Sequence, residues 1–471
     1  MGVHSWRPIL KSSLVAWGLL FLPFAVTALP ADPNGDDDFD VAIIGGGSSG
    51  TYAAIRLQDL GKKIVLVEAT ERLGSHAYTW TDPETNTPID IGVQIFDPDK
   101  PIVDEYLARL NISLGPTDLE VGGPTDYFDF STGKSIGYEP PSQEETEAAF
   151  ARWAELLDKY SYLDDGYYLP EPVPEELLLP FGEFAKRYKL EAAVPFFALF
   201  AEGIGDFAQV PALYLLHFLD KPILSGSRLR TTAAHNVSLI YTHARAILGD
   251  SVLLNTRVSA LSRPANALVS LTLSIPGRPD RKIRAKRVIA AFPQLLPNFA
   301  GWDLDDDERG LFTEFAATGI HCAVVRHSGI EANHTLQNVA PDTAYNLPRL
   351  PAVYNYGPSR VPGLVKAYYG IAANTDAPES ASRDALLDTL TRLGLPTADA
   401  PQPVVEVDKS HFPYFLRVGV DQIRAGFYNR LYALQGHRSI FYTGAALSRQ
   451  NSASIWRFTE QEVIRKIMVG V

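Results

Sequence analysis

The stretch FDVAIIGGGSSGTYAAIRLQDLGKKIVLVE, residues 39–68, decides the fold. Its first six residues form a short β-branched run bounded by glycine, which predicts a buried parallel strand. A helix is expected over residues 49–60, ended by Gly61 in a left-handed conformation, and a second strand over residues 63–68. The order strand, helix, strand is that of a βαβ unit in an α/β fold.

The glycines between the first strand and the helix predict a binding site for a dinucleotide. Gly45, Gly47 and Gly50 fit the pattern G-x-G-x-x-G. The first allows a tight turn, the second lets a pyrophosphate approach the backbone, and the third lets the helix pack close to the strand. The helix, beginning at Ser49, would offer free N–H groups to the phosphates. Glu68 ends the second strand, where its carboxylate can accept hydrogen bonds from ribose hydroxyls.

The composition is that of an ordinary globular chain and excludes several classes of protein. Of 471 residues, 46% are apolar and 21% charged, so disorder, collagen and coiled coil are excluded for the whole chain. The net charge of −13 makes nucleic acid an unexpected partner. With one cysteine, Cys322, the chain has no internal disulfide, and its ten histidines show no ligand spacing, so no metal is expected.

Residues 1–28 are expected to be a secretory signal peptide. They combine a mildly basic start, an apolar run of about 15 residues and a small-residue cleavage site ending at Ala28. The alternative is a membrane anchor, but a span needs about 20 apolar residues. Three sequons, at Asn111, Asn236 and Asn333, agree with glycosylation in the secretory pathway. We therefore expect a protein that is secreted or resides in an endomembrane lumen, without a stable membrane span after cleavage.

The residues after the second strand resemble the extended FAD fingerprint of the flavin amine-oxidase superfamily. In that fingerprint the acid is followed by R-x-G-G-R-x-x-T, whose arginine and glycines wrap the FAD phosphates. Arg72, Gly74 and Thr79 match it here. Ser75 replaces the second glycine, and His76 stands where many members have arginine. The resemblance implies that the cofactor is FAD.

Two later segments resemble motifs that contact other parts of FAD. Residues 89–96, which include Gly92 and Gln94, resemble the segment that passes beneath the flavin ring. Residues 251–261 resemble the strand whose central valine, here Val258, contacts the adenine through its backbone.

Three further segments continue the resemblance in the superfamily's order. Residues 287–293 resemble the strand that returns to the FAD domain, and residues 439–446 the final strand and its glycine turn. Gly444 and Ala445 in that turn would lie beside the FAD pyrophosphate. Residues 452–467 would form the last helix, with its N-terminus toward the flavin.

The ordered motifs predict an α/β fold with a Rossmann-like FAD-binding domain and a discontinuous, mixed-sheet substrate domain under a helical cap. The FAD-binding domain is expected to comprise residues 38–100, 229–300 and 405–471, and the substrate domain residues 101–228 and 301–404. Further elements are expected in the substrate domain: helices at 142–160 and 383–393, and strands at 320–327, 351–357 and 363–372.

The cap is rich in phenylalanine and leucine, which either pack as a core or partly line a large apolar pocket. Gly203-Ile-Gly205 imitates a second nucleotide turn, but the residues before it favour a helix break. Without a bound nicotinamide, electrons are expected to enter from an organic substrate and leave to O2 or another acceptor.

Three features, together with the signal peptide and the G-x-H-x-x-T fingerprint, resemble the β-cyclopiazonate dehydrogenase family of filamentous fungi. They are residues 412–415, 434–436 and 442–446. The resemblance implies an FAD-dependent oxidoreductase of secondary metabolism, an oxidase or dehydrogenase. Such an enzyme removes a hydride from a small, apolar, prenylated or terpenoid-type substrate, and oxidative ring closure can follow.

Two other functions stay open at this point. The first is an amine or L-amino-acid oxidase, although residues 452–457 lack the tyrosine that amine oxidases usually place near the flavin. The second is a non-catalytic FAD-binding interaction protein, which would not bleach its flavin anaerobically with any substrate.

The sequence does not identify a catalytic residue. His411, just before Pro413, is a candidate base, and the alternative is a solvent-exposed histidine. Lys366 is a candidate for the flavin-side lysine of amine oxidases, and the alternative is a strand lysine that faces solvent. Cys322 is a candidate flavin attachment point, and the alternative is a small, buried core residue.

Overall fold

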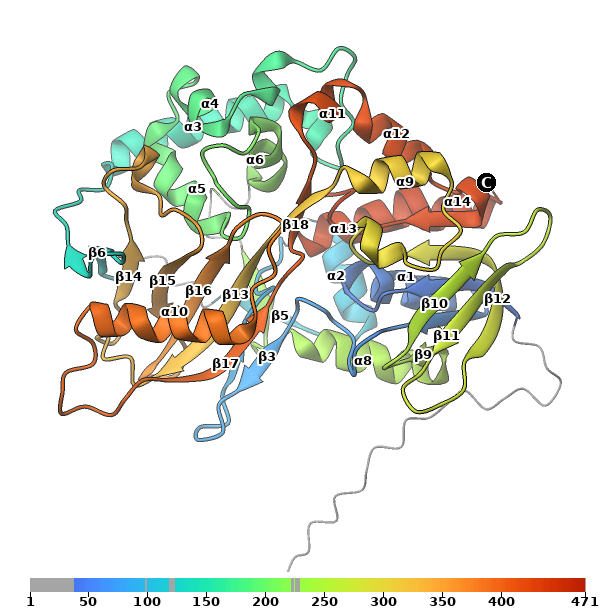
Figure 1. Ribbon diagram of the computed structural model, residues 1–471, viewed down its shortest axis with the longest axis horizontal. Coiled ribbons are helices and arrows are strands. Elements are labelled where there is room, and N and C mark those ends of the chain that lie inside the picture. Colours follow the sequence, from blue (N-terminus) through green and yellow to red (C-terminus); the bar gives the residue numbers. More distant parts are fainter. Residues whose placement is uncertain (1–37, 98–99, 118–122, 222–223, 225–228, 471) are drawn as a thin grey trace, which may run out of the picture.

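The computed structural model describes residues 38–97, 100–117, 123–221, 224 and 229–470. The expected signal peptide lies outside these residues. Two lobes, each built on its own β-sheet, lie side by side (Figure 1). Of the helices described, none combines the length and the apolar character that a membrane-spanning segment requires.

The sheet of the first lobe has the order β10-β11-β12-β1-β2-β9, with β19 paired to β12. Its strands are β1 (Asp38–Ile44), β2 (Ile64–Val67), β9 (Val252–Leu253), β10 (Arg257–Ser262), β11 (Val269–Ser274), β12 (Arg281–Ala290) and β19 (Ile440–Tyr442). β1 runs parallel to β2 and β12, and Ile43 pairs with Leu66 on one side and Ile289 on the other. The strand–helix–strand prediction is confirmed, because α1 (Ser48–Asp59) joins β1 to β2 and Gly61 follows it with φ +75°.

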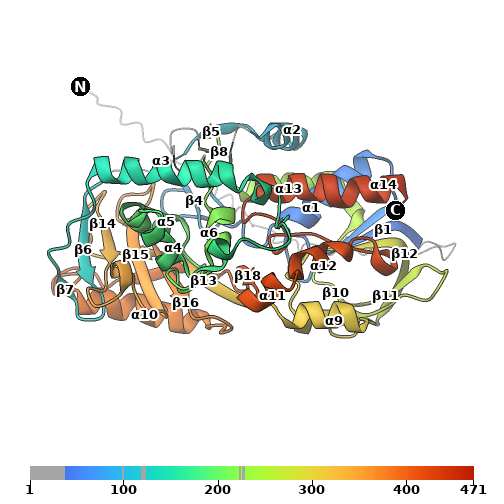
Figure 2. The same cartoon turned by 90° about the horizontal axis from the view of Figure 1, so that it is seen from above.

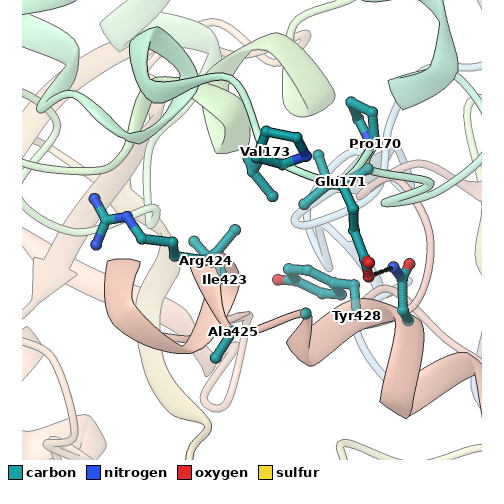
Figure 3. A pocket seen from close by; sticks show the side chains of 11 residues that line it. Pro170, Glu171, Val173, Ile423, Arg424, Ala425 and Tyr428 are labelled. Atoms are coloured by element: carbon teal, nitrogen blue, oxygen red, sulfur yellow. Dashed lines mark hydrogen bonds between the residues drawn. The ribbon is translucent and has the colours of Figure 1, made fainter.

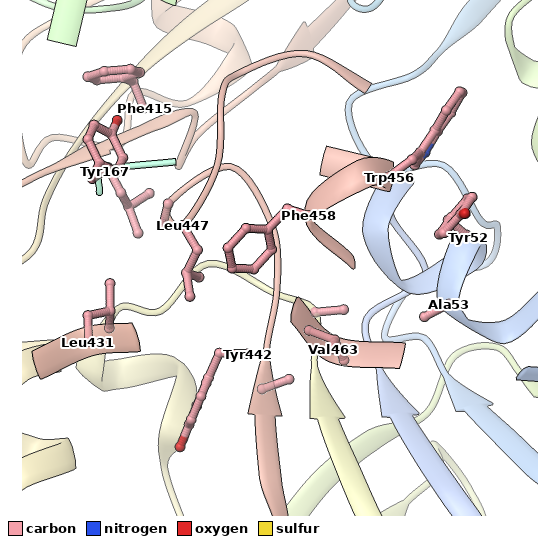
Figure 4. Packing of buried hydrophobic residues seen from close by; sticks show 14 of the residues in the cluster. Tyr52, Ala53, Tyr167, Phe415, Leu431, Tyr442, Leu447, Trp456, Phe458 and Val463 are labelled. Atoms are coloured by element: carbon pink, nitrogen blue, oxygen red, sulfur yellow. The ribbon is translucent and has the colours of Figure 1, made fainter. Parts of the chain in front are cut away.

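Helices cover both faces of this sheet, which explains the unbroken apolar runs of β1 and β2. Figure 2 shows α1, α13 (Ser452–Phe458) and α14 (Arg465–Val469) along one face and α9 (Asp306–Thr313) toward the other. In the core beneath α13, Phe458 lies near Leu447, and Trp456 stacks on Tyr52 with ring centroids 6.1 Å apart (Figure 4). The expected last helix is confirmed, although a π-helical segment over Thr459–Ile464 interrupts it.

The sheet of the second lobe has the order β17-β13-β16-β15-β14-β6-β7, with β18 paired to β13. Its strands are β6 (Thr125–Asp129), β7 (Lys134–Ser135), β13 (Ala316–Arg326), β14 (Thr335–Asn338), β15 (Ala352–Pro358), β16 (Leu364–Ile371), β17 (Val404–Ser410) and β18 (Phe415–Arg417). Helix α10 (Glu379–Arg392) covers one face, against Ala323 and Val325 of β13. The alternating residues Ile320, Cys322 and Val324 face the other side, where they contact the first lobe.

A cap of helices lies on that other side, opposite α10 (Figure 2). Its helices are α3 (Gln143–Lys159), α4 (Phe181–Arg187), α5 (Val194–Phe200) and α6 (Ala212–Phe218). Trp153, Phe181, Phe184 and Phe197 are fully buried, and the rings of Trp153 and Phe197 are 4.7 Å apart between centroids. These four cap aromatics therefore pack as a core.

The division into domains differs from the expected one at three places. β17 and β18, placed by sequence in the FAD-binding block that begins at residue 405, pair with β13 of the second sheet. Conversely, α2 (Pro101–Arg109) packs on the first lobe, where the ring centroids of Tyr106 and Tyr52 are 4.9 Å apart. Glu308 of α9 likewise accepts a hydrogen bond from Tyr442 at 2.7 Å. Short apolar segments carry no local signal for the sheet they join, so only long-range pairing decides their place.

Candidate active site

The turn between β1 and α1 has the geometry that a pyrophosphate needs. Gly45 has φ +103°, and a Cβ on it would lie 2.6 Å from the carbonyl oxygen of Ala291. A Cβ on Gly50 would lie 1.8 Å from the Gly45 carbonyl oxygen, so only glycine lets α1 pack this close to β1. Gly47 precedes α1 without a side-chain cap, and a Cβ there would contact only Ser75, at 3.3 Å. The first N–H groups of α1, at Ser49 and its neighbours, are therefore available to an anion.

Glu68 is held at the end of β2 by hydrogen bonds to both of its carboxylate oxygens. Oε2 accepts the Gly46 backbone N–H at 2.7 Å. Oε1 accepts the backbone N–H and the hydroxyl of Thr70, at 2.7 and 2.8 Å. This arrangement joins the carboxylate to the glycine turn and fixes it where a ribose would lie.

The fingerprint loop wraps onto the same turn. The Gly74 N–H donates to the Gly46 carbonyl oxygen at 2.8 Å. The Arg72 guanidinium donates to the carbonyl oxygens of Leu73, Ala77 and Ser75, at 3.0, 2.9 and 2.7 Å. Arg72 therefore holds the loop in shape through its backbone. Ser75, at the place of the superfamily's second glycine, keeps a glycine-like φ of +47°.

His411 is buried, with 2% of its surface exposed, so the alternative of a solvent-exposed histidine is wrong. Its Nε2 lies 3.2 Å from the carbonyl oxygen of His76, and its Nδ1 lies 3.1 Å from that of Lys409. Burial lowers the pKa of His411 to about 4 and that of His76 to about 3, so both rings are neutral at pH 7. Because both His411 nitrogens face backbone carbonyls, the geometry favours a positioning role over that of a base.

Gly92 lies directly against these two histidines. It has φ +138°, and a Cβ on it would lie 2.1 Å from the His76 carbonyl oxygen and 2.7 Å from His411 Nε2. The segment expected beneath the flavin is thus packed against the fingerprint loop and against the residue that follows β17.

Lys366 is half-buried and points toward Gln94, so the alternative of a strand lysine that faces solvent is also wrong. Its Nζ donates to Gln94 Oε1 at 2.8 Å, and Gln94 Nε2 donates to the Tyr368 hydroxyl at 3.3 Å. This contact joins β16 to the segment that contains Gly92. Cys322 is 4% exposed on β13, as expected for a small core residue.

The remaining predicted FAD contacts lie around the same turn. Gly444, with φ +124°, follows β19, and a Cβ on it would be 3.9 Å from Ser49 Oγ. Ala445 comes next and is half-buried. The Thr256 N–H donates to the Glu68 carbonyl oxygen at 2.9 Å, which brings Val258, two residues further on, near the strand end that carries the acid.

A cavity of about 620 Å³ lies where the two lobes meet, and Asp90, Gln94 and Lys366 are among its lining residues. A separate surface pocket of about 320 Å³ lies between residues 170–173 and the helices α11 (Val420–Arg424) and α12 (Phe427–Ala433) (Figure 3). None of the predicted FAD contacts lines this second pocket.

The three predicted glycosylation sites differ in exposure. Asn111 and Asn333 are exposed, whereas Asn236 is half-buried just before α8 (Ser238–Leu248). Glycosylation at all three sites stays a prediction.

Several residues near the site were not singled out from the sequence. They are Glu202, Tyr354, Asn355 and Tyr368, and Tyr414 was noted only as part of the 412–415 motif. Glu202 is the one charged residue in the otherwise uncharged stretch 194–205, between an aromatic helix and the Gly203–Gly205 break. This is the local signal that could have drawn attention to it. A β-bulge between Val353 and Asn355 interrupts the regular alternation of side chains along β15. The alternation of a regular strand therefore does not predict to which face of the sheet Tyr354 points.

Comparison with known proteins identifies the family. Residues 48–455 match the family of flavin containing amine oxidoreductases. The chain belongs to this family. The chain is 36% identical to FAD-dependent oxidoreductase oblC of Cochliobolus heterostrophus, over 98% of this chain and 99% of the relative. It is 33% identical to β-cyclopiazonate dehydrogenase of Aspergillus oryzae, over 94% of this chain and 97% of the relative.

Solved structures share the fold of this flavin amine oxidoreductase. A fatty acid isomerase from P. acnes has a TM-score of 0.71 at 22% identity, covering 91% of this chain and 99% of the isomerase. Putrescine oxidase bound to putrescine has a TM-score of 0.64 at 18% identity, covering 92% of this chain and 99% of the oxidase. At these identities the likeness shows the fold alone.

The protein is thus an FAD-dependent oxidoreductase with fungal relatives in secondary metabolism. The described residues fit FAD, because a bare glycine turn, a fixed carboxylate and a loop folded over them form one continuous cradle. Glu68 would hold the ribose, and Gly47 with the start of α1 would hold the pyrophosphate.

Proposed function

We propose that the protein oxidises a small, largely apolar organic substrate of the prenylated or terpenoid type by removing a hydride, and that ring closure can follow. The observation that carries the proposal is the similarity to β-cyclopiazonate dehydrogenase over nearly the whole of both chains. When bound, FAD supplies the two-electron acceptor, and O2 or another acceptor then regenerates it.

The wall of the second sheet supports this substrate class. Tyr354, Tyr368 and Tyr414 pack there against a cluster of buried apolar residues that includes Ile320 and Cys322. Burial raises the pKa of each phenol above its usual value, which keeps all three neutral. Neutral aromatic rings suit a carbon skeleton that carries a few polar groups.

The last helix gives less support to an amine oxidase. Its first turn consists of Ser452, Ala453 and Ser454, and the aromatic residue that follows, Trp456, stacks on Tyr52 of α1. A tyrosine beside the flavin from this helix, as amine oxidases usually have, is therefore missing from residues 452–457. This favours a substrate that is not recognised as an amine.

The test follows flavin bleaching without oxygen as three classes of compound are offered: simple amines, L-amino acids and a prenylated or terpenoid intermediate. We expect bleaching by the third class only. Rapid bleaching by an amine or amino acid, with none by the prenylated compound, would overturn the proposal in favour of an amine or L-amino-acid oxidase. Failure of all three classes, with a flavin that dithionite still reduces, would favour the non-catalytic alternative.

Passage through the secretory pathway is part of the same proposal. It is supported by residues 1–28 and by the exposure of Asn111 and Asn333. Retention of the protein in the cytosol of the producing cell, with an intact N-terminus, would contradict it.

A further inference from the structure

A carboxyl group that the FAD site does not use, Glu202, lies over the face of the second sheet that turns toward the first lobe. It follows α5 in the cap and is partly buried. Its Oε1 accepts a hydrogen bond from Nδ2 of Asn355, a buried residue of β15. The partner is a neutral amide and not a cation, so this hydrogen bond does not tie Glu202 into an ion pair.

Tyr414 links Glu202 to the FAD fingerprint. Its ring centroid lies 6.0 Å from that of His76 in the fingerprint loop. On its other side, its Cδ1 would lie 2.9 Å from a Cβ placed on Gly203, the residue after Glu202. Tyr414 therefore lies between Gly203 and the fingerprint loop, and its phenol also interacts electrostatically with the Glu202 carboxyl group.

The groups that face Glu202 are mostly neutral. The titratable side chains that interact electrostatically with it come from β13, β15, β16 and the loop before β18. They are Cys322, Tyr354, Lys366, Tyr368 and Tyr414. Lys366 is the one cation in this set, and its Nζ donates to Gln94.

This environment gives Glu202 an unusual affinity for a proton. Burial raises the pKa of Glu202 to about 8, although the Asn355 hydrogen bond and the Lys366 charge both lower it. A carboxylate with this pKa is a far stronger base than an ordinary glutamate. A catalytic base works best when its pKa lies near the operating pH.

We propose that Glu202 is the general base of the oxidation, accepting the proton that the substrate loses. The proposal rests on the proposed function. The substrate's C–H bond breaks and its electron pair leaves with the hydride to FAD, which is reduced by two electrons. An O–H, N–H or neighbouring C–H bond of the substrate also breaks, and its electron pair forms the new ring bond or double bond. The proton moves to the Glu202 carboxylate and is released to solvent before the next turnover.

The kinetic test measures the pH dependence of anaerobic flavin reduction with whichever compound of the panel bleaches the flavin. Glu202→Gln keeps the acceptor for Asn355 but cannot take a proton. In the wild type the rate should rise with pH through about 8, because only the carboxylate is active. Glu202→Gln should be slower by roughly 10²–10⁴-fold at high pH and lose that rise. Glu202→Asp should be slower but keep the rise.

The matched control is Glu183→Gln, on the exposed surface of α4 in the same cap, which should leave rate and pH profile unchanged. A wild-type rate and profile in Glu202→Gln would overturn the proposal. A slower rate with an unchanged pH rise would also overturn it, since that result is the mark of a purely structural role.

A second measurement does not depend on turnover. Burial also raises the pKa of Asp90, to about 6, so that carboxyl titrates first. Infrared difference spectra of the oxidised holoprotein between about pH 6 and about pH 10 should show a further protonated carboxyl band, which disappears with an apparent pKa near 8 and is absent in Glu202→Gln. If no compound of the panel bleaches the flavin, the proposed function fails, while the infrared titration still decides separately whether Glu202 titrates there. Absence of the band in the wild type, or its persistence in Glu202→Gln, overturns the assignment.

Discussion

Glu68→Gln is the sharpest test of the FAD site, because the substitution changes charge and hydrogen bonding but not shape. The carboxylate accepts from Gly46 N–H through one oxygen and from Thr70 through the other. A carboxamide has a single acceptor oxygen, so its NH2 group must face one of these donors. The ribose hydroxyls would also lose a charged acceptor.

The magnitude follows from these contacts. A hydrogen bond to a charged group contributes about 1.5–3 kcal/mol, and 1.4 kcal/mol corresponds to a factor of ten. We therefore expect Glu68→Gln to weaken FAD binding by about 10- to 100-fold.

The assay uses protein produced under riboflavin limitation and titrated with FAD, with binding followed by quenching of flavin fluorescence. Glu71→Gln is the matched control, since Glu71 is exposed in the same loop and should leave the affinity unchanged. If Glu68→Gln binds FAD with wild-type affinity, or if Glu71→Gln loses as much affinity, the proposed role of Glu68 in binding the FAD ribose is refuted.

Three further predictions concern other parts of the molecule. Gly92→Ala should lower the flavin content per polypeptide, measured by visible absorbance, because its Cβ would lie 2.1 Å from a backbone oxygen at φ +138°; full occupancy would contradict this. Arg263→Ala should lower the free energy of unfolding in urea by about 3–5 kcal/mol, because it leaves the fully buried Glu308 without its cation; a loss under about 1 kcal/mol would show that the pair contributes little. Burial lowers the pKa of His321, but the hydrogen bond and charge of Asp408 outweigh it and raise that pKa above its usual value. This pair therefore stabilises the fold fully below about pH 6.5, and the stabilisation is lost as pH rises through the raised pKa of His321. Asp408→Asn should flatten this part of the curve of unfolding free energy against pH. An unchanged curve would assign the pH dependence to other groups.

Local signals were enough for the nucleotide-binding unit. The first strand, the glycine turn, the helix and the second strand are consecutive, and the contacts that fix them join residues of one short segment. Gly45 and Gly50 meet each other across the turn, and Glu68 returns to Gly46, 22 residues earlier. The FAD cofactor could therefore be predicted from sequence, and so could the strands and the helix that hold it.

The substrate side was not predictable in the same way. Lys366 meets Gln94 across 272 residues, His411 meets His76 across 335, and Glu202 meets Asn355 across 153. No local pattern encodes such pairs, because each depends on how the two sheets are placed against each other. The alternatives in which Lys366 and His411 face solvent were wrong for this reason.

The amino-acid sequence by itself determined the family, the cofactor and the strand–turn–helix that holds it. The reason is that the backbone conformation of this turn can be formed only with glycine at a few positions. The tertiary structure alone decided that β17 and β18 join the second sheet, that the cap's aromatic rings fill a core, and that a single glutamate faces a wall of tyrosines. A side chain's protonation and its partners follow from burial and long-range packing, which exist only once both lobes have folded.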